Sequence, residues 1–96
     1  MGENILFMPS HILRNPSISP IGKVVYMVLR SYTVETDYCS PKICELCAVV
    51  GATAKPINRA IDELIDHKLV KRKQIGLGKP NCYTLLPIYR EGFNGN

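Results

Sequence analysis

A short stretch of the chain carries side chains that suit hydrogen bonding to nucleic-acid bases. Four polar residues fall between positions 53 and 59: Thr53, Lys55, Asn58 and Arg59. An arginine can donate two hydrogen bonds to guanine O6 and N7, and an asparagine can pair with adenine N6 and N7, each contact giving about 1–3 kcal/mol of discrimination. The free N–H groups that follow Thr53 at the start of a helix can hold a phosphate. This stretch therefore predicts contacts to base edges and to the nucleic-acid backbone.

Acidic residues follow the same stretch and offer Arg59 a different partner. Asp62 and Glu63 stand three and four residues after it, the spacing at which side chains meet on a helix surface. A surface ion pair would then occupy the guanidinium, and Asn58 would be an ordinary solvent-exposed side chain. Both interpretations remain open from the sequence.

A second group of cations follows further along the chain. Residues 53–79 contain seven Lys or Arg and three acidic residues, while the whole chain has a net charge of +4 and a pI near 9.0. Such clustering is a better sign of nucleic-acid binding than the total charge. The cations of this second group would add salt-dependent affinity without sequence preference: Lys71, Arg72, Lys73 and Lys79. In a strand, alternation places Lys71 and Lys73 on one face and Arg72 on the other.

The four cysteines suggest a different chemistry. Cys39, Cys44 and Cys47 have the spacing of plant-type iron–sulfur ligands, with Cys82 far downstream, and four thiolates would equally suit zinc. However, Cys44 and Cys47 fall on a predicted helix among apolar residues, where a free cysteine acts as a small hydrophobic side chain. Cys82 precedes Tyr83 in a predicted strand and faces away from the core. We therefore predict no cofactor or metal, and keep a Cys-ligated metal or iron–sulfur sensor as an alternative.

Three main helices are predicted to position these residues. Ser19-Pro20 caps the first, whose apolar stripe is Ile21, Val24, Val25, Val28, Leu29 and Tyr32. Ser40-Pro41 opens a second, shorter helix that ends at Gly51. The third helix spans residues 53–69, with Thr53 as its N-cap and an apolar stripe formed by Ile57, Ala60, Ile61, Leu64 and Ile65. A preceding turn opened by Pro9 supplies Phe7, Ile12 and Leu13 to the core.

Two strands are predicted after the third helix. Residues 70–75 and 81–86 read as an antiparallel pair, and residues 76–80 form a glycine-rich tip. Tyr83 and Leu85 share the face that packs on the helices. Residues 33–39 are expected to be a polar loop.

This order of elements resembles a winged helix-turn-helix domain. The residues that carry the resemblance are Ser19-Pro20-Ile21-Gly22-Lys23-Val24-Val25-Tyr26, then Gly51, Thr53 and Ile57-Asn58-Arg59-Ala60-Ile61, and finally Asn81-Cys82-Tyr83-Thr84-Leu85. They look like the domains of bacterial phage and plasmid replication initiators and small transcriptional regulators. The resemblance implies an α+β, mainly α fold with three main helices and a C-terminal β-hairpin wing. It also implies that the third helix enters the major groove through Thr53, Lys55, Asn58 and Arg59, and that Lys71, Arg72, Lys73 and Lys79 of the wing hold the flanking backbone.

The predicted organisation is a single domain over residues 7–86, between a flexible N-terminus (1–6) and a flexible tail or linker (87–96). No apolar run approaches the roughly twenty residues of a membrane span, so a cytoplasmic protein is expected. No catalytic constellation is recognisable, and an enzyme is not predicted. The predicted function is sequence-specific binding of double-stranded DNA in replication initiation or transcription regulation, as a possible homodimer with a replication or transcription partner. The alternative is a protein-interaction module that docks through Tyr32, Tyr38, Tyr89 or Phe93.

Overall fold

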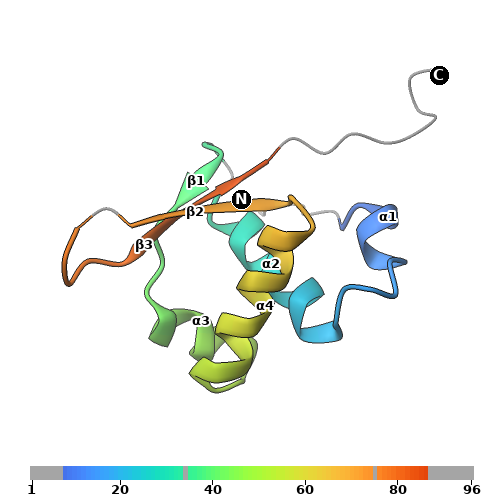
Figure 1. Cartoon of the computed structure of the whole chain (residues 1–96), viewed down its shortest axis with the longest axis horizontal. Helices are drawn as coiled ribbons and strands as arrows, with labels where there is room; N and C mark the ends of the chain where they lie inside the picture. Colours follow the sequence, from blue (N-terminus) through green and yellow to red (C-terminus); the bar gives the residue numbers. More distant parts are fainter. Residues whose placement is uncertain (1–7, 34, 75, 87–96) are drawn as a thin grey trace, which may run out of the picture.

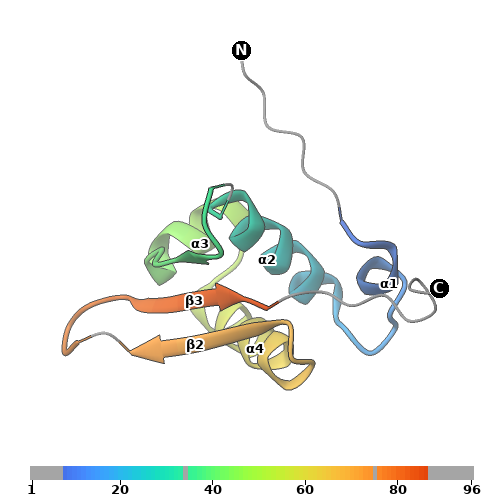
Figure 2. The same cartoon turned by 90° about the horizontal axis from the view of Figure 1, so that it is seen from above.

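The computed structural model describes residues 8–33, 35–74 and 76–86. The elements follow one another as α1 (Ser10–Leu13), α2 (Pro20–Ser31), β1 (Tyr38–Cys39), α3 (Ile43–Val50), α4 (Ala54–Asp66), β2 (Val70–Gln74) and β3 (Asn81–Leu85). The sheet lies on one side of the helices, and the hairpin of β2 and β3 extends away from α1 (Figures 1 and 2). The predicted α+β, mainly helical class is confirmed. The predicted flexible ends, residues 1–6 and 87–96, lie outside the described residues, as do Phe7, Tyr89 and Phe93.

Helix α2 begins where the Ser19-Pro20 pair predicts. Ser19 is the N-cap, and its Oγ accepts a hydrogen bond from the backbone N–H of Gly22 at 3.0 Å. The predicted apolar stripe was partly wrong, because Val24 is 46% exposed and Tyr32 is 41% exposed, whereas Tyr26 is fully buried. Residues 24–29 are all apolar, so periodicity alone does not decide which side of α2 packs against α3 and α4.

Helix α3 begins later than the Ser40-Pro41 pair predicts. Its first residue is Ile43, and the N-cap is Lys42, whose backbone N–H donates to Oε1 of Glu45 at 2.7 Å. Ser40 therefore does not cap the helix. The reason is that Glu45, three residues after the N-cap, accepts a hydrogen bond from the backbone N–H of Lys42. The start of the helix is therefore capped from within, and a serine before it is not required.

The turn between α3 and α4 is short and has the predicted geometry. Gly51 ends α3 in the left-handed conformation with φ 82°, where glycine is favoured. The backbone N–H groups of Gly51 and Ala52 both donate to the carbonyl of Cys47, at 2.8 and 3.2 Å. Helix α4 then starts at Ala54. Helices α3 and α4 with this turn form a helix-turn-helix.

The sheet has one strand more than predicted. Its order is β1-β3-β2, and all pairs are antiparallel. The expectation of a plain loop over residues 33–39 was wrong, since Tyr38 pairs with Thr84 and Cys39 pairs with Tyr83. A two-residue strand has no periodicity to detect, and its partner is more than forty residues away.

One core joins the helices to the sheet. The helices contribute mainly aliphatic side chains and Tyr26, and the sheet contributes Cys39, Val70, Tyr83 and Leu85. Tyr83 and Leu85 are buried on the helix-facing side, as predicted, and Ile12 of α1 is buried as well. Leu13, also expected to pack, is more than half exposed. Helix-turn-helix and hairpin are therefore parts of one folding unit.

Candidate nucleic-acid interface

Helix α4 separates an apolar face from a polar one. Ile57, Ala60, Ile61 and Leu64 are buried. Apart from Ala54, the exposed residues before and within its first two turns are those selected from the sequence: Thr53, Lys55, Asn58 and Arg59. They follow the tight turn at Gly51 directly. The structure thus brings all four to one exposed end of the helix.

The start of α4 differs from the prediction in one detail. Thr53 occupies the N-cap position, but its side chain makes no capping hydrogen bond. Pro56, at the third helical position, has no N–H. The backbone N–H groups of Ala54 and Lys55 are therefore the donors that the first turn offers to an anion.

Asp62 of α4 pairs with the hairpin. Its Oδ1 accepts a hydrogen bond from Nη2 of Arg72 at 3.1 Å, and the two side chains are 62% and 36% exposed. Arg72 stands opposite Tyr83 in the hairpin register. Because Tyr83 is buried against the helices, Arg72 lies on the helix-facing side of β2. This ion pair connects α4 to the wing.

Glu63 of α4 pairs with the start of α2. Its Oε2 accepts from the backbone N–H of Ser19 at 3.0 Å, and its Oε1 accepts from the Ser19 hydroxyl at 2.8 Å. A Cβ at Gly22 would collide with the same carboxylate, so glycine allows this close approach. The carboxylate also lies at the positive end of the α2 dipole. Glu63 thereby fixes α4 against α2.

Arg59 makes no ion pair within the part of the chain that the structure describes. The two acids that could have occupied it, Asp62 and Glu63, are bound to Arg72 and Ser19 instead. Asn58 likewise has no side-chain hydrogen bond to any described residue. Both side chains are exposed and available to an external ligand.

The hairpin presents its cations on different sides. Lys71 and Lys73 stand opposite Thr84 and Cys82, on the face away from the helices, as alternation predicts. Lys79 is exposed at the tip, where its backbone N–H donates to the carbonyl of Gly76 at 3.1 Å. Lys71 and Lys73 therefore lie on the outer face of the wing and Lys79 is exposed at its tip, whereas Arg72 faces inward.

The cysteines do not assemble into a metal site among the described residues, where no group of three or more His, Cys, Asp or Glu side chains could hold an ion. Cys39 is buried, Cys44 is exposed, and Cys47 and Cys82 are partly buried. The exposed position of Cys44 contradicts its predicted role as a small core side chain. Burial raises the pKa of the Cys39 thiol to about 11, with a smaller contribution from nearby Cys82.

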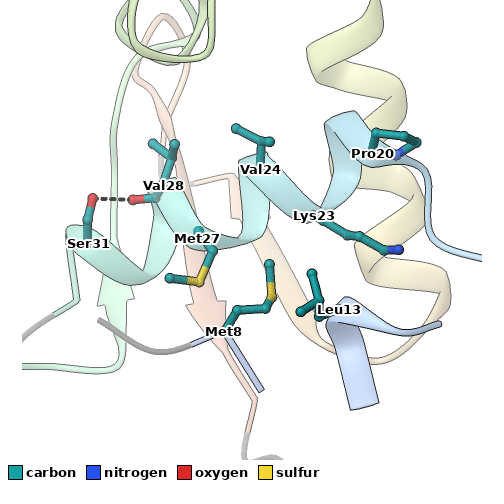
Figure 3. A pocket seen from close by; sticks show the side chains of 8 residues that line it. All are labelled: Met8, Leu13, Pro20, Lys23, Val24, Met27, Val28 and Ser31. Atoms are coloured by element: carbon teal, nitrogen blue, oxygen red, sulfur yellow. Dashed lines mark hydrogen bonds between the residues drawn. The ribbon is translucent and has the colours of Figure 1, made fainter. Parts of the chain in front are cut away.

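An apolar groove of about 540 Å³ lies between α1 and α2. Met8 and Leu13 point toward α2, and Met27 projects toward them (Figure 3). Lys23 is the one ionisable residue in its lining, and no residue of α4 or of the wing contributes to it. This groove is therefore separate from the cationic surface described above.

Sequence reasoning missed the partners that hold α4 in place. Ser19 was recognised as a helix cap, but its contact with Glu63 joins residues 44 positions apart. The spacing of Asp62 and Glu63 after Arg59 suggested a local ion pair, and that pair is absent from the described residues. The glycine at position 22, inside a helix, was the available signal of a close approach.

A helix-turn-helix followed by a two-stranded wing on a shared core defines the winged helix-turn-helix class. The chain belongs to a family of helix-turn-helix domains whose pattern matches residues 17–70. No helix in the described ranges is both long and apolar enough to cross a lipid bilayer.

Three solved structures share this fold. One, described as an MDR initiator, has a TM-score of 0.71 and 21% identity, over 97% of this chain and 86% of that one. A Rep–DNA complex has a TM-score of 0.70 and 17% identity, over 97% and 84%. The N-terminal domain of a DNA binding protein has a TM-score of 0.69 and 21% identity, over 93% and 79%. A comparison with curated proteins found no match.

Proposed function

We propose that this domain binds double-stranded DNA sequence-specifically, with α4 in the major groove and the wing on the flanking backbone. The observation that carries the proposal is the exposed start of α4, where Lys55, Asn58 and Arg59 follow a tight turn and make no ion pair with a described residue. A major-groove helix uses its N-terminal residues in this way. Lys71, Lys73 and Lys79 then supply phosphate contacts.

The biological setting that fits best is replication initiation in a bacterial cytoplasm, on a plasmid or phage, with transcription regulation as the alternative. Its support is the description of two structures of the same fold, a Rep–DNA complex and an MDR initiator. Two-fold symmetric sites would suit a homodimer, since half-site recognition favours dimers. A replication or transcription protein would be its further partner.

Titration of fluorescent duplex DNA with the protein tests the proposal. Random-sequence duplexes should bind at low salt and lose affinity steeply as salt rises, because phosphate neutralisation releases counterions. Selection from the random pool then supplies a preferred site. On that site, Arg59→Ala should lose about 5- to 150-fold in affinity, the equivalent of about 1–3 kcal/mol for one bidentate base contact. Lys71→Ala removes one of the phosphate contacts of the wing, so it should weaken all duplexes alike and lower the salt slope by about one.

Arg14→Ala is the matched control, because Arg14 is an exposed cation at the C-cap of α1. Helix α1 lies away from the start of α4 and from the wing (Figure 1). Its affinity should stay within twofold of the wild type. Equal binding by Arg59→Ala and the wild type on the selected site would exclude α4 as the reading helix. If the protein binds no duplex even at low salt, the proposal that it binds DNA is wrong. The protein-interaction alternative would then apply, for which Tyr32 and Tyr38 are exposed.

A further inference from the structure

Two carboxylates follow the predicted base-reading arginine at helical spacing. Asp62 and Glu63 lie three and four residues after Arg59, where an isolated helix would pair them with its guanidinium. An ion pair of that kind would have to break before Arg59 could reach a base. A free carboxylate beside the major groove would also repel phosphate.

In the folded domain each of the two carboxylates forms hydrogen bonds with a residue other than Arg59. Glu63 accepts two hydrogen bonds from Ser19, on the N-terminal side of α2. Asp62 accepts from Arg72 of the wing at 3.1 Å. The two contacts come from different elements, the start of α2 and strand β2, and each engages a carboxylate that could otherwise pair with Arg59.

Arg72 is placed for this contact by the strand register. Among the three cations of β2, it alone stands opposite the buried Tyr83, and Lys71 and Lys73 project from the other face. Its guanidinium is therefore directed at α4, and the bond to Asp62 uses part of its hydrogen-bonding capacity.

We propose that Arg72 is a positioning residue that keeps Asp62 away from Arg59, so that the Arg59 guanidinium stays free to bind DNA. This inference rests on the proposed function. It replaces the direct phosphate contact expected for Arg72 from the sequence. In this role Arg72 acts on DNA affinity through Asp62, and it has no effect of its own once Asp62 is neutral.

A double-mutant cycle separates the two roles. Arg72→Gln alone should weaken binding to the selected duplex at least fivefold, because Asp62 is released toward Arg59 and the phosphates. In an Asp62→Asn background the same change should alter the affinity by less than twofold. An equal loss in both backgrounds means that Arg72 contacts phosphate directly and overturns the proposal.

Lys73→Gln is the matched control, since it removes one cation from the outer face of the same strand. Lys73→Gln should change the affinity for the duplex by the same factor in the wild type and in the Asp62→Asn background. Thermal melts verify that each variant is folded. The ion pair is partly exposed, so stability should change little; loss of the fold in Arg72→Gln would overturn the proposal in favour of a structural role.

A measurement without DNA distinguishes failure of this inference from failure of the proposed function. The Nε–Hε resonance of Arg59 in a ¹⁵N-labelled protein should shift in Arg72→Gln and return when Asp62→Asn is added. An unchanged resonance in Arg72→Gln overturns the inference, even where the wild type binds DNA normally. If the resonance shifts and returns as expected but the wild-type protein does not bind duplex DNA, the proposed function is wrong. The role of Arg72 in DNA binding is then overturned as well.

Discussion

Replacing Glu63 with alanine should remove the contact that holds α4 against α2. The change deletes the acceptor of two partly buried hydrogen bonds, from the Ser19 backbone N–H at 3.0 Å and from its hydroxyl at 2.8 Å. Hydrogen bonds to charged groups contribute about 1.5–3 kcal/mol each. A carboxylate at a helix N-terminus adds about 0.3–1 kcal/mol. Because both bonds share one partly exposed partner, we expect a total loss of about 2–3 kcal/mol.

Such a loss should be visible in thermal and urea unfolding followed by circular dichroism. In a domain of this size, about 4–8 °C of Tm correspond to 1 kcal/mol, so Tm should fall by about 8–24 °C. The urea midpoint should fall while the m-value stays constant. Glu63→Gln keeps one acceptor and should lose about half as much.

Asp66→Ala provides the control, because Asp66 is an exposed acid at the C-terminal end of the same helix. Its stability should stay within about 0.5 kcal/mol of the wild type. If Glu63→Ala and Asp66→Ala are equally stable, the Glu63–Ser19 contact does not hold α4, and the reasoning from its geometry is wrong.

Three further predictions concern single sites. Lys68 has a left-handed backbone with φ 61°, so Lys68→Gly should raise the free energy of unfolding by about 0.5–1 kcal/mol in urea titrations. A lower free energy of unfolding would show that the lysine side chain matters more than the backbone strain. In the folded protein at pH 8, mass spectrometry should find iodoacetamide on exposed Cys44 well before buried Cys39, whose pKa is raised to about 11; equal rates would contradict that burial. The same raised pKa means that unfolded Cys39 loses its proton near pH 9.0 and folded Cys39 only near 11, so stability should fall as pH rises across this interval. Cys39→Ala should reduce that fall in urea titrations, and an identical pH dependence would refute the assignment.

Local signals allowed most of the elements to be predicted. Ser19-Pro20, Gly51 and the alternation around Tyr83 each depend on neighbours in the sequence, and each prediction is confirmed. The start of α3 was misplaced because two capping signals compete within a few residues, and Glu45 prevails over Ser40. Periodicity does not predict the buried face of α2, because residues 24–29 are all apolar and lie on every side of the helix.

The candidate site shows where sequence reasoning ends. Composition and spacing placed Lys55, Asn58 and Arg59 on the exposed side of α4, as found. Whether Arg59 is free depends on partners that come from α2 and from the wing. Those contacts are set by tertiary packing, which no local pattern contains. The wing residues and their roles toward DNA remain predictions.

Strand β1 has a consequence for how the domain folds. Its pairing with β3 joins Tyr38 to Thr84 and so closes a loop that contains α3, α4 and β2. Closing a loop of this length is slow and entropically costly, so these contacts should form after the local helical turns and the hairpin. Once formed, they make opening of the hairpin and opening of the helices a single event. The backbone N–H of Leu85, which donates to the carbonyl of Asp37 at 2.8 Å, should therefore exchange with solvent only when the whole domain unfolds.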